Sequence, residues 1–276
     1  MTALADREWR LIPEEPRPGP MQMALDEVAA ATAAAGGPRT VRVYRWQPST
    51  LSLGYGQDPA TVDWGFCEAE GVDVTRRQTG GGAIYHDERG DVSYSIIAPA
   101  AELPGDLLSS YERLCRPVLD AFERMGVDAR FAESEAPGVH DPACYLRPLE
   151  PAHDVVAGDG RKISGNAQYR QREAVIQHGS LTYQRLTGTH LDCFVADLDP
   201  AAFRDRVTSI REQAGIGRSA AVAILEEALG DWADAEEGCW RDDELSRARD
   251  LAAAKYAGED WIRHGTDPEA PSERSR

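Results

Sequence analysis

Two segments of the chain repeat apolar residues every three to four positions, which is the spacing of an amphipathic helix. The first runs from Gly19 to Ala35 and places on one face Met21, Ala24, Leu25 and Val28. The second runs from about Leu107 to Met125 and has the stronger amphipathic pattern. Both segments are predicted to be helices that pack one side against a hydrophobic core.

Shorter segments rich in β-branched and aromatic residues predict strands. The clearest is Asp91–Ala98, where Val92, Tyr94 and Ile96 alternate on one face, as in a half-buried strand. The irregular, proline-bearing stretch from 137 to 149 indicates a long loop. The other predicted strands are Thr40–Trp46, Thr50–Gly54, Val72–Gln78, Ala83–His86, Ala129–Ala132, His153–Ala157, Lys162–Gln168 and Val175–Tyr183.

Strands and helices are mixed without regular β-α-β alternation, which favours an α+β fold over a doubly wound parallel sheet. The pattern becomes mainly helical and acidic after about Leu198. We therefore expect a main domain over residues 1–198 and a small, mainly helical C-terminal segment over residues 199–264. The polar tail, residues 265–276, is predicted to be disordered.

The composition is that of a globular protein, since 42% of the 276 residues are hydrophobic and suffice for a sizeable core. No run of about 18 apolar residues occurs, so we expect no membrane span. The N-terminus carries early charges and lacks an apolar segment, which argues against a secretory signal. These features predict a cytoplasmic protein.

The chain has five cysteines without CxxC spacing, at positions 67, 115, 144, 193 and 239. An odd, unpatterned set in a cytoplasmic chain argues against a disulfide framework and against a zinc cluster. We therefore expect no metal site and interpret most of these cysteines as small buried apolar residues.

The formal net charge is −17, and the phosphate backbone would repel such a surface, so we expect no nucleic-acid partner. Of the 30 basic residues, only Lys162 and Lys255 are lysines. An acid-rich, lysine-poor composition is typical of halophilic proteins. Because almost all basic residues of this chain are arginines, a remaining lysine is expected to have a role that arginine cannot fill.

The first motif that could carry chemistry is RRQTGGGAIYHD, residues 76–87. Three consecutive glycines lack side chains, so a ligand can approach the backbone and its N–H groups can face an anion. The flanking arginines supply bidentate donors for a carboxylate or phosphate. The motif lies between two predicted strands and no helix follows it, which excludes the P-loop and the dinucleotide fingerprint. For GGG alone a hairpin turn is roughly as good an interpretation, but the adjoining RR and HD favour a ligand-binding loop.

The second motif is DGRKISGNAQ, residues 159–168. A lysine just after a tight turn could place its ammonium group against a phosphate or an acyl-adenylate carbonyl. A solvated strand-edge charge is usually the commoner role, but an ordinary exposed charge in this chain would be an arginine, which favours a functional Lys162. Gly165 in mid-strand indicates a close backbone approach or a bulge.

The third motif is QHGSL, residues 177–181. His178 precedes a glycine on a predicted strand, where it could transfer a proton or form hydrogen bonds within a site. A structural histidine is at least as frequent, so this motif alone does not decide between the two roles.

In combination, RRQTGGGAIYHD, GRKISGNAQ and QHGSL resemble the lipoate–protein ligase family, including its octanoyltransferase relatives. Met21–Glu27 (MQMALDE) resembles the N-terminal helix of the family, and Thr50–Gln57 (TLSLGYGQ) resembles its second strand. Lys255–Trp261 (KYAGEDW) looks like the closing motif KYxxxEW, with Asp260 in place of the usual glutamate. The resemblance covers roughly residues 9–263, nearly the whole chain.

The resemblance implies the fold of biotin–protein ligases and class II aminoacyl-tRNA synthetases, a mixed or antiparallel sheet flanked by helices, with residues 1–198 as the catalytic domain. In the ligases, ATP with Mg²⁺ activates lipoate as lipoyl-AMP. The acyl group then passes to a lysine of a lipoyl domain of a 2-oxoacid dehydrogenase complex or of the glycine-cleavage H protein. The leading expectation is therefore an ATP-dependent lipoate–protein ligase, assisted by a separate accessory chain for adenylation.

The resemblance also implies roles for single residues. Lys162 would act in catalysis by stabilising the charge of the acyl-adenylate, and His86 and Asp87 would anchor the glycine loop. The acyl chain would need an apolar tunnel, for which the candidates are Leu25, Val43 and Leu53. The full set of implied binding residues is Arg77, Gly80, Gly81, Gly82, Ala83, Ile84, Tyr85, His86, Asp87, Lys162, Gly165 and His178.

The main alternative lies within the same family. One branch of octanoyltransferases uses a cysteine nucleophile in the loop before the GRK motif and forms a thioester without ATP. Cys144 lies in that loop, within HDPACYL, 18 positions before Lys162, and a neighbouring positive charge would favour its thiolate. The uninterrupted GGGAIYHD resembles the ATP-using ligases, so the ligase interpretation leads.

Two other interpretations are weaker. A biotin–protein ligase would carry a GRGRxGR-type loop, which this chain lacks. A non-catalytic homologue that only binds lipoyl domains would not need Arg77, Gly80–Gly82 and Lys162 intact. The sequence does not specify the acyl length, the acceptor or the oligomeric state.

Overall fold

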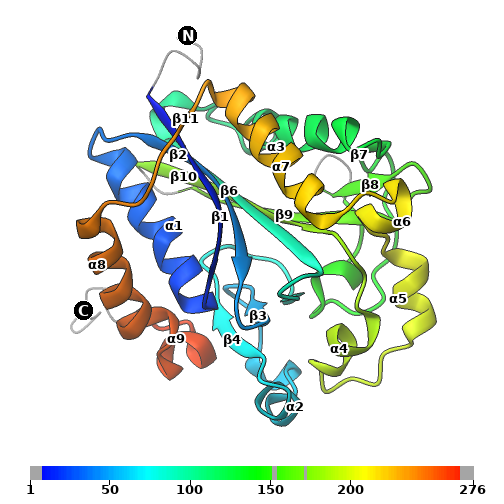
Figure 1. Ribbon diagram of the computed structural model, residues 1–276. Coiled ribbons are helices and arrows are strands. Elements are labelled where there is room, and N and C mark those ends of the chain that lie inside the picture. The colour runs from blue at the N-terminus through cyan, green and yellow to red at the C-terminus, as the bar shows by residue number, and fades with distance from the viewer. Residues whose placement is uncertain (1–7, 151–153, 171–172, 268–276) are drawn as a thin grey trace.

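The computed structural model describes residues 8–150, 154–170 and 173–267. Its centre is an eight-stranded sheet with the strand order β11-β1-β2-β6-β10-β9-β8-β7 (Figure 1). Strand β1 runs parallel to both of its neighbours, and the other pairings in this sheet are antiparallel. In chain order the strands are β1 (Trp9–Arg17), β2 (Arg39–Trp46), β6 (Asp91–Pro99), β7 (Ala129–Phe131), β8 (Val155–Ala157), β9 (Lys162–Arg170), β10 (Ala174–Thr182) and β11 (Glu236–Glu237).

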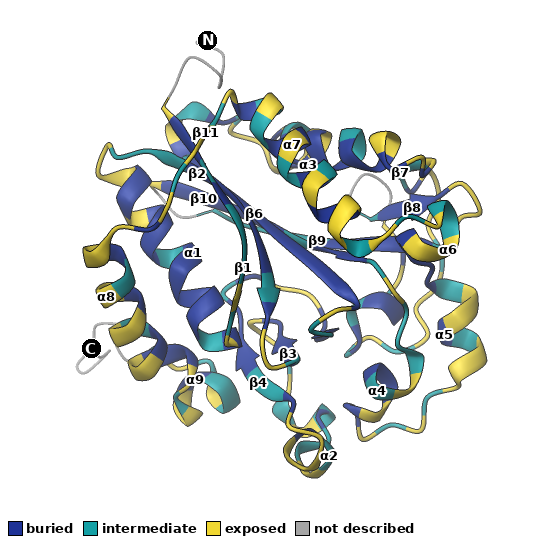
Figure 2. Cartoon of the chain, viewed as in Figure 1, coloured by how far each residue is buried: buried dark blue, intermediate teal, exposed yellow. Residues whose placement is uncertain are grey.

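The apolar face of the sheet is covered by α3 (Leu107–Arg124) and α7 (Arg218–Ala233), which also pack against each other. Alternate residues of β6, namely Val92, Tyr94 and Ile96, belong to the hydrophobic core beneath these two helices. Figure 2 shows the buried sides of both helices turned toward the sheet. The predicted alternation along this strand therefore fixes which side of the sheet the helices cover.

The opposite face is covered by α1 (Gly19–Ala34), α8 (Asp242–Leu251) and the short π-helix η5 (Ala252–Tyr256). Two residues of β6 on this side are polar and buried. The hydroxyl of Ser95 donates to Asp26 of α1, and the hydroxyl of Ser93 accepts from the indole N–H of Trp46. Because buried polar groups need partners, this face carries a hydrogen-bond network as well as a core.

A second, three-stranded sheet has the order β4-β3-β5 and supports the triple-glycine motif. Its strands are β3 (Thr50–Leu53), β4 (Asp73–Arg76) and β5 (Ile84–His86), and the glycines lie in the connection from β4 to β5. The remaining helices are η2 (Pro59–Thr61), α2 (Trp64–Ala69), η3 (Ala100–Glu102), η4 (Cys144–Leu146), α4 (Thr187–Asp192), α5 (Pro200–Arg206), α6 (Ile210–Ala214) and α9 (Glu259–His264).

The predicted α+β class is confirmed, as are the two predicted helices and the predicted strands to within a few residues at their ends. His153, the predicted start of one strand, lies outside the described residues, and that strand is observed from Val155. The sheet is mixed and helices flank both of its faces, as the family resemblance implied.

Strand β1 is the main element that the pattern analysis did not predict. Its sequence, WRLIPEEPR, contains two prolines and three charged residues after Leu11, which are unusual in a strand. Pro13 lies where the register to β2 shifts between Ile12 and Glu15, and such a bulge tolerates a residue without a backbone N–H. Strand β11 has only two residues, too few for a periodic signal.

The segment after residue 198 contributes to the same cores as the earlier part of the chain. Leu225 and Leu229 of α7 lie in the core with Val92, and β11 pairs with β1 at the sheet edge. The expected division at residue 198 stays a prediction. Most of the tail predicted to be disordered, residues 268–276, lies outside the described residues.

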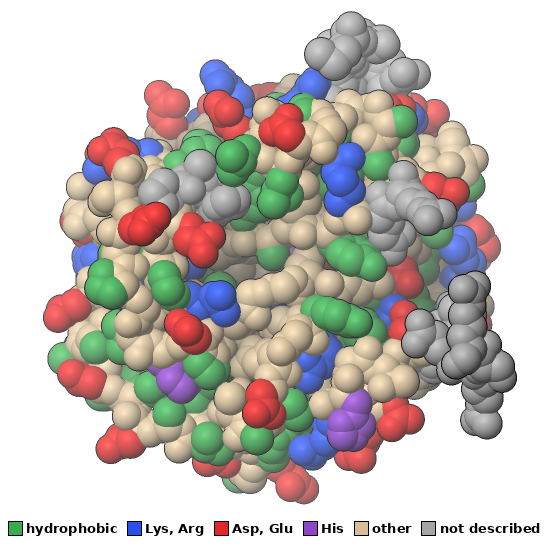
Figure 3. All heavy atoms as spheres, turned by 180° about the vertical axis from the view of Figure 1, so that it is seen from behind, with side chains coloured by type: hydrophobic (Ala, Val, Ile, Leu, Met, Phe, Trp, Pro, Cys, Tyr) green, Lys and Arg blue, Asp and Glu red, His purple; other side chains and the backbone are tan. Residues whose placement is uncertain are grey.

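Charged side chains of both signs are interspersed over the face seen in Figure 3. Charged residues of the described part of the chain also form ion pairs at the surface, such as Arg124 with Asp231 at 2.8 Å. Of the helices in the described part of the chain, none is both long and apolar enough to cross a membrane.

Candidate active site

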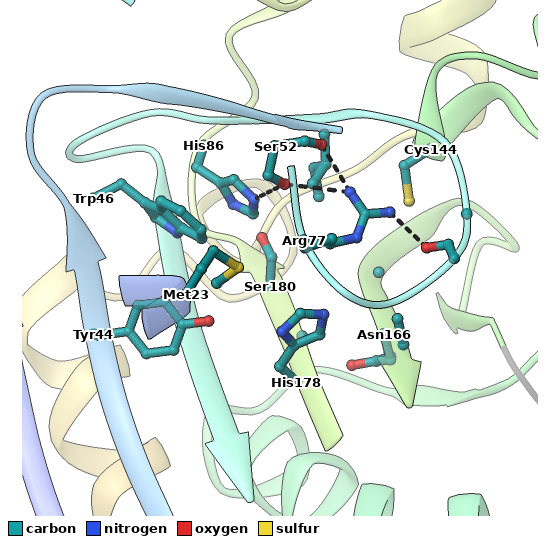
Figure 4. A pocket seen from close by; sticks show the side chains of 16 residues that line it. Met23, Tyr44, Trp46, Ser52, Arg77, His86, Cys144, Asn166, His178 and Ser180 are labelled. Carbon is teal, nitrogen blue, oxygen red and sulfur yellow. Dashed lines mark hydrogen bonds between the residues drawn. The ribbon is translucent and has the colours of Figure 1, made fainter. Parts of the chain in front are cut away.

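A cavity, partly open to solvent, lies between α1, strands of both sheets, the triple-glycine connection and the loop that carries Cys144. Figure 4 shows Met23, Tyr44 and Trp46 along one side of it. The side chains of Arg77 and Cys144 lie on the other side. The cavity therefore combines an apolar, aromatic wall with a wall of reactive and polar groups.

The glycine loop, residues 77–83, is built from close backbone contacts. A Cβ atom added to Gly54 would lie 1.9 Å from the carbonyl oxygen of Gly81. A Cβ atom on Gly82 would lie 2.7 Å from the carbonyl oxygen of Pro142, and Gly81 has a φ of +94° that L side chains rarely adopt. Packing therefore requires glycine at positions 54 and 82 and the backbone conformation favours it at position 81, whereas a Cβ atom on Gly80 would meet nothing within 4 Å.

Arg77 holds the glycine loop in shape. Its guanidinium donates to the carbonyl oxygens of Gly80 and Gly82, both at 2.8 Å, and to that of Ser52 at 2.7 Å. Its Nε donates to the hydroxyl of Thr79 at 3.0 Å. Burial lowers the pKa of Arg77 to about 10, so the group stays charged at neutral pH. These bonds occupy the donors that we expected to face a ligand anion, so Arg77 supports the loop from within.

The loop that carries Cys144 is docked on the glycine loop by backbone hydrogen bonds. Ala83 N–H donates to the carbonyl of Pro142 at 2.6 Å, and Cys144 N–H donates to the carbonyl of Ala83 at 2.8 Å. This pairing places the partly exposed thiol in the cavity wall. The sulfur would lie 3.3 Å from a Cβ atom added to Gly165, so that glycine leaves room for the thiol.

Lys162 lies beside Cys144, at the start of β9, with only 4% of its surface exposed. Its ammonium is 2.5 Å from Asp154 Oδ1 and 3.3 Å from the carbonyl oxygen of Cys144. Burial opposes the charge, but electrostatic interactions with Cys144 and Asp154 outweigh it and raise the pKa of Lys162. The interpretation of Lys162 as an exposed strand-edge charge is therefore wrong, and Lys162 lies beside the Cys144 loop, which is itself docked on the glycine loop.

The second lysine of the chain is buried as well. Lys255 is 1% exposed, and its ammonium lies 3.1 Å from Glu27 Oε2 and 2.7 Å from Asp267 Oδ2. It also lies over the ring of Trp261, 4.5 Å from the centroid. Both lysines thus occupy confined sites where a compact ammonium fits between carboxylates and aromatic rings.

His86 is part of a buried chain of hydrogen bonds in the cavity wall. Its Nε2 lies 2.9 Å from Ser52 Oγ, its Nδ1 lies 2.6 Å from Asp91 Oδ2, and its ring stacks on Trp46 at 4.2 Å. Burial lowers the pKa of His86 in spite of Asp91, so the ring is neutral at neutral pH. A neutral ring satisfies both contacts when Nδ1–H donates to Asp91 and Nε2 accepts from Ser52.

His178 is held between α1 and the glycine loop. Its Nε2 lies 2.8 Å from Thr79 Oγ1 and its Nδ1 lies 3.4 Å from Asp26 Oδ2. Asp26 also accepts from Arg42 at 2.9 Å. Burial raises the pKa of Asp26, but Arg42 and His178 outweigh that effect and keep the carboxylate charged. His178 of the third motif therefore lines the cavity, and both of its ring nitrogens already have polar partners.

The other predicted residues divide into those at the cavity and those away from it. Gly80, Gly81, Ile84 and Gly165 line it. Tyr85 and Asp87 do not: the Tyr85 hydroxyl donates to Asp87, whose other oxygen accepts the N–H groups of the following turn. None of the residues suggested for an acyl tunnel lines the cavity, because three separate cores contain Leu25, Val43 and Leu53.

Several lining residues were not anticipated. Asn166 and Ser180 lie inside the second and third motifs, so the sequence could have suggested them as site residues. Tyr44 and Trp46 alternate along a predicted strand, but nothing in the sequence shows which face of that strand borders a cavity. Asp154 has no sequence signal, because only folding brings it to Lys162.

Comparison with known proteins gives consistent matches over most of the chain. Residues 18–231 match the family described as the lipoyl protein ligase A/B catalytic domain. One curated relative is Octanoyltransferase LipM of Kyrpidia tusciae, 31% identical over 288 residues, covering 92% of this chain and 97% of the relative. Another is Octanoyltransferase LipM of Symbiobacterium thermophilum, 31% identical over 277 residues, covering 93% and 98%.

Solved structures with a similar fold come from the same group of enzymes. A bi-partite lipoate protein ligase of Thermoplasma acidophilum, described with its E2 lipoyl domain, has a TM-score of 0.79 at 23% identity. That match covers 96% of this chain and 100% of the other. A lipoate-protein ligase A bound with ATP has a TM-score of 0.77 at 24% identity, with coverage of 93% and 98%. At these identities the likeness shows the fold.

Proposed function

The chain is an enzyme of the lipoyl protein ligase A/B family, and from this premise we propose that it is an octanoyltransferase that works through a thioester on Cys144. The proposal rests on one observation: a cysteine thiol lies in the cavity wall with a buried ammonium group beside its backbone. Because the thiolate is the nucleophilic form of cysteine, a fixed positive charge nearby supports such a role.

The leading expectation from the sequence, an ATP-dependent lipoate–protein ligase, is wrong. Curated relatives that match over more than 90% of this chain are octanoyltransferases. A transferase moves an acyl group that is already activated, so the expected ATP and Mg²⁺ have no step to serve. Without an adenylation step, the accessory chain that was expected for that step is not needed either. Within the uninterrupted triple glycine, which had favoured the ligase, Gly82 packs against the Cys144 loop.

The proposed reaction has two steps through the same sulfur. The Cys144 thiolate attacks the carbonyl carbon of an octanoyl thioester, and the donor thiolate leaves and takes up the proton released by Cys144. A neutral lysine amine of the acceptor then attacks the Cys144 thioester. The amide forms, the Cys144 thiolate leaves, and the proton lost by the amine restores the thiol.

The apolar wall of the cavity suits an aliphatic chain of medium length. Met23, Tyr44 and Trp46 line the side that faces Arg77 and Cys144. Burial of each methylene of the chain contributes about 0.8 kcal/mol. We propose that the octanoyl chain lies against this wall with its carbonyl at Cys144.

Lys162 is proposed to keep the site positively charged. Its pKa is raised, so the ammonium persists at neutral pH, and Asp154 fixes its position at 2.5 Å. Arg77 and His86 are proposed to act indirectly, by holding the glycine loop and the cavity wall in place. Lys162, Arg77 and His86 are not proposed to form a covalent bond with the acyl group.

The proposed acceptors are lipoyl domains of 2-oxoacid dehydrogenase complexes or the glycine-cleavage H protein. The test incubates purified enzyme, an octanoyl-acyl carrier protein and an acceptor domain without ATP. Acceptor mass should increase by one octanoyl group per domain, and ATP with Mg²⁺ should not change the rate. Cys144→Ser should abolish the reaction, whereas the exposed cysteine Cys239, changed to serine, should not. Binding of the acceptor without acylation would instead favour a non-catalytic homologue.

A further inference from the structure

The Cys144 loop runs from Ala136 to Leu149 and is closed at its base. Ala136 N–H donates to the carbonyl of Leu149 at 3.3 Å, and Leu149 N–H donates back to the carbonyl of Ala136 at 2.9 Å. Within the loop, Val139 N–H donates to the carbonyl of Leu146 at 2.7 Å. The two arms are therefore joined into one unit, and a group that holds both arms also sets where Cys144 lies.

Arg206, the last residue of α5, holds both arms of this loop. Its Nη2 donates to the carbonyl oxygen of Pro137 at 2.7 Å, on the arm before Cys144. The same nitrogen donates to the carbonyl oxygen of Arg147 at 3.0 Å, on the arm after Cys144. The carbonyl oxygen of Ala136 lies 3.5 Å from it. One guanidinium nitrogen thus ties the two arms to the end of α5.

The residues that follow Arg206 hold the backbone of Lys162. The N–H of Thr208 donates to the carbonyl of Lys162 at 2.9 Å, and Val207 forms a parallel β-bridge with Lys162. The carbonyl of Val207 in turn accepts from Arg185 at 2.6 Å, which fastens this short segment to the end of β10. Consecutive residues therefore contact the loop of the thiol and the strand of the ammonium group.

The same part of the chain packs against the residues beside Cys144. Phe203 and Val207 are buried in one hydrophobic core with Ala143 and Tyr145, the two neighbours of Cys144. Protein interiors are close-packed and transmit the displacement of one group to the next. A shift of the end of α5 would therefore move Cys144.

We propose that Arg206 is a positioning residue for acyl transfer, which fixes the Cys144 thiol relative to the Lys162 ammonium by holding the Cys144 loop against the segment that bonds Lys162. This inference rests on the proposed function. In that function Lys162 keeps the site positively charged, and the effect of a charge on the thiol falls with the distance between them. Arg206 itself contacts no reacting atom and transfers no proton.

The test measures single-turnover acylation of Cys144 over a range of octanoyl-acyl carrier protein concentrations. Arg206→Met removes the donors and keeps an unbranched side chain. Its maximal rate should fall about 100-fold, the loss that follows a misplacement of about 1 Å in a catalytic geometry. The half-saturating donor concentration should stay as in wild type, because no contact with the donor is removed. Arg204→Met is the matched control, since Arg204 is exposed on the same helix, and it should react at the wild-type rate.

A second comparison is made in the Lys162→Met background. If Arg206 acts by fixing the thiol relative to the ammonium, Arg206→Met should lower the rate much less once the ammonium is gone, since two groups that act through one contact are not additive. Arg206→Lys should recover most of the rate lost in Arg206→Met, because an ammonium group can still donate to both carbonyls. Thermal melting of all variants should show that they are folded.

Each outcome separates the inference from the proposed function. A wild-type enzyme that forms no thioester on Cys144 overturns both. If wild type forms the thioester and Arg206→Met forms it equally fast, the inference alone is overturned. A raised half-saturating concentration with an unchanged maximal rate would mean that Arg206 binds the donor. A double variant that loses the product of the two single effects would mean that Arg206 acts independently of Lys162, which also contradicts the inference.

Discussion

At the scale of single residues, the chemistry depends on side chains whose size matters as much as their charge. Lys162 fits between Asp154, the Cys144 carbonyl and the ring of Tyr145 with 4% of its surface exposed. A guanidinium has the same charge but is planar and wider. The 28 arginines of this chain show that positive charge alone does not explain why a lysine is present here.

We predict that Lys162→Arg lowers the rate of Cys144 thioester formation about 100-fold, the scale on which one electrostatic contact acts in a preorganised site. The larger group would displace Asp154 or the Cys144 loop. The measurement is single-turnover acylation by quenched-flow mass spectrometry. Lys255→Arg is the matched control, because Lys255 is equally buried but contacts Glu27 and Asp267 and not the Cys144 loop. It should lower the melting temperature more than the rate, and an active Lys162→Arg enzyme would refute this role.

Met23 is expected to limit the length of the acyl chain. It borders both the main cavity and a smaller one that also involves Gln78, Tyr169 and Tyr256. Met23→Ala should join these spaces and raise the rate with a decanoyl donor, relative to octanoyl, by about tenfold, since two further buried methylenes are each worth about 0.8 kcal/mol.

Competition between the two donors, read out by mass of the acylated enzyme, gives the ratio directly. Met21→Ala is the control, because Met21 is buried on the same helix but does not line the cavity. An unchanged preference for octanoyl in Met23→Ala would show that another residue sets the length.

At the scale of elements, the site is assembled by the docking of two loops. The glycine loop contacts the Cys144 loop through Gly82 and Ala83. The Arg77 guanidinium lies inside the glycine loop and donates a hydrogen bond to the Gly82 carbonyl oxygen. The motifs RRQTGGG and GRKISGNAQ could be located from the sequence because each has an unusual composition. Their docking could not be foreseen, because the contacts are between backbone atoms and leave no pattern in side chains.

Gly82→Ala should therefore impair thioester formation while the protein stays folded. The added methyl would lie 2.7 Å from the Pro142 carbonyl oxygen and 2.9 Å from Cys144 N, so the Cys144 loop must move. A displacement of about 1 Å in a catalytic geometry lowers rates by roughly 100-fold.

The comparison variant is Gly56→Ala, since a Cβ atom at Gly56 meets nothing within 4 Å. Both proteins should melt cooperatively, and only Gly82→Ala should acylate slowly. Wild-type acylation by Gly82→Ala would show that the docking of the two loops is not needed for the reaction.

At the scale of the whole molecule, the α+β class and most element positions could be predicted, because amphipathic periodicity survives even in a chain with a net charge of −17. Strand β1 could not be predicted, because its prolines and charged residues are typical of a loop and because it pairs with residues distant in the sequence. The sequence motifs of the site could be predicted, but the cavity that they help to form could not. Only the tertiary fold brings Trp46 to the cavity and Asp154 to Lys162.

Long-range ion pairs connect the C-terminal helices to the N-terminal strands. Glu244 of α8 is fully buried and accepts both Nη groups of Arg10 in β1 at 2.7 Å, and Thr32 of α1 at 2.9 Å. Burial raises the pKa of Glu244, but these bonds outweigh it and lower the pKa to about 2 from an ordinary 4.5. The stabilisation is complete above pH 4.5 and is lost as the pH falls toward 2.

The free energy of unfolding of wild type should therefore fall with decreasing pH across this window. Glu244→Gln should be less stable at pH 7 and should show a smaller slope between pH 4.5 and 2. Urea unfolding at a series of pH values measures both. Equal slopes in the two proteins would mean that Glu244 titrates normally in the folded state.

The central claim is that Cys144 carries the acyl group between donor and acceptor. The most direct measurement is peptide mapping by mass spectrometry of wild-type enzyme mixed with octanoyl-acyl carrier protein alone, without ATP or acceptor. We predict one octanoyl group on Cys144, labile to hydroxylamine and lost on addition of a lipoyl domain. An unmodified Cys144 in an enzyme that nevertheless acylates the domain would contradict the account.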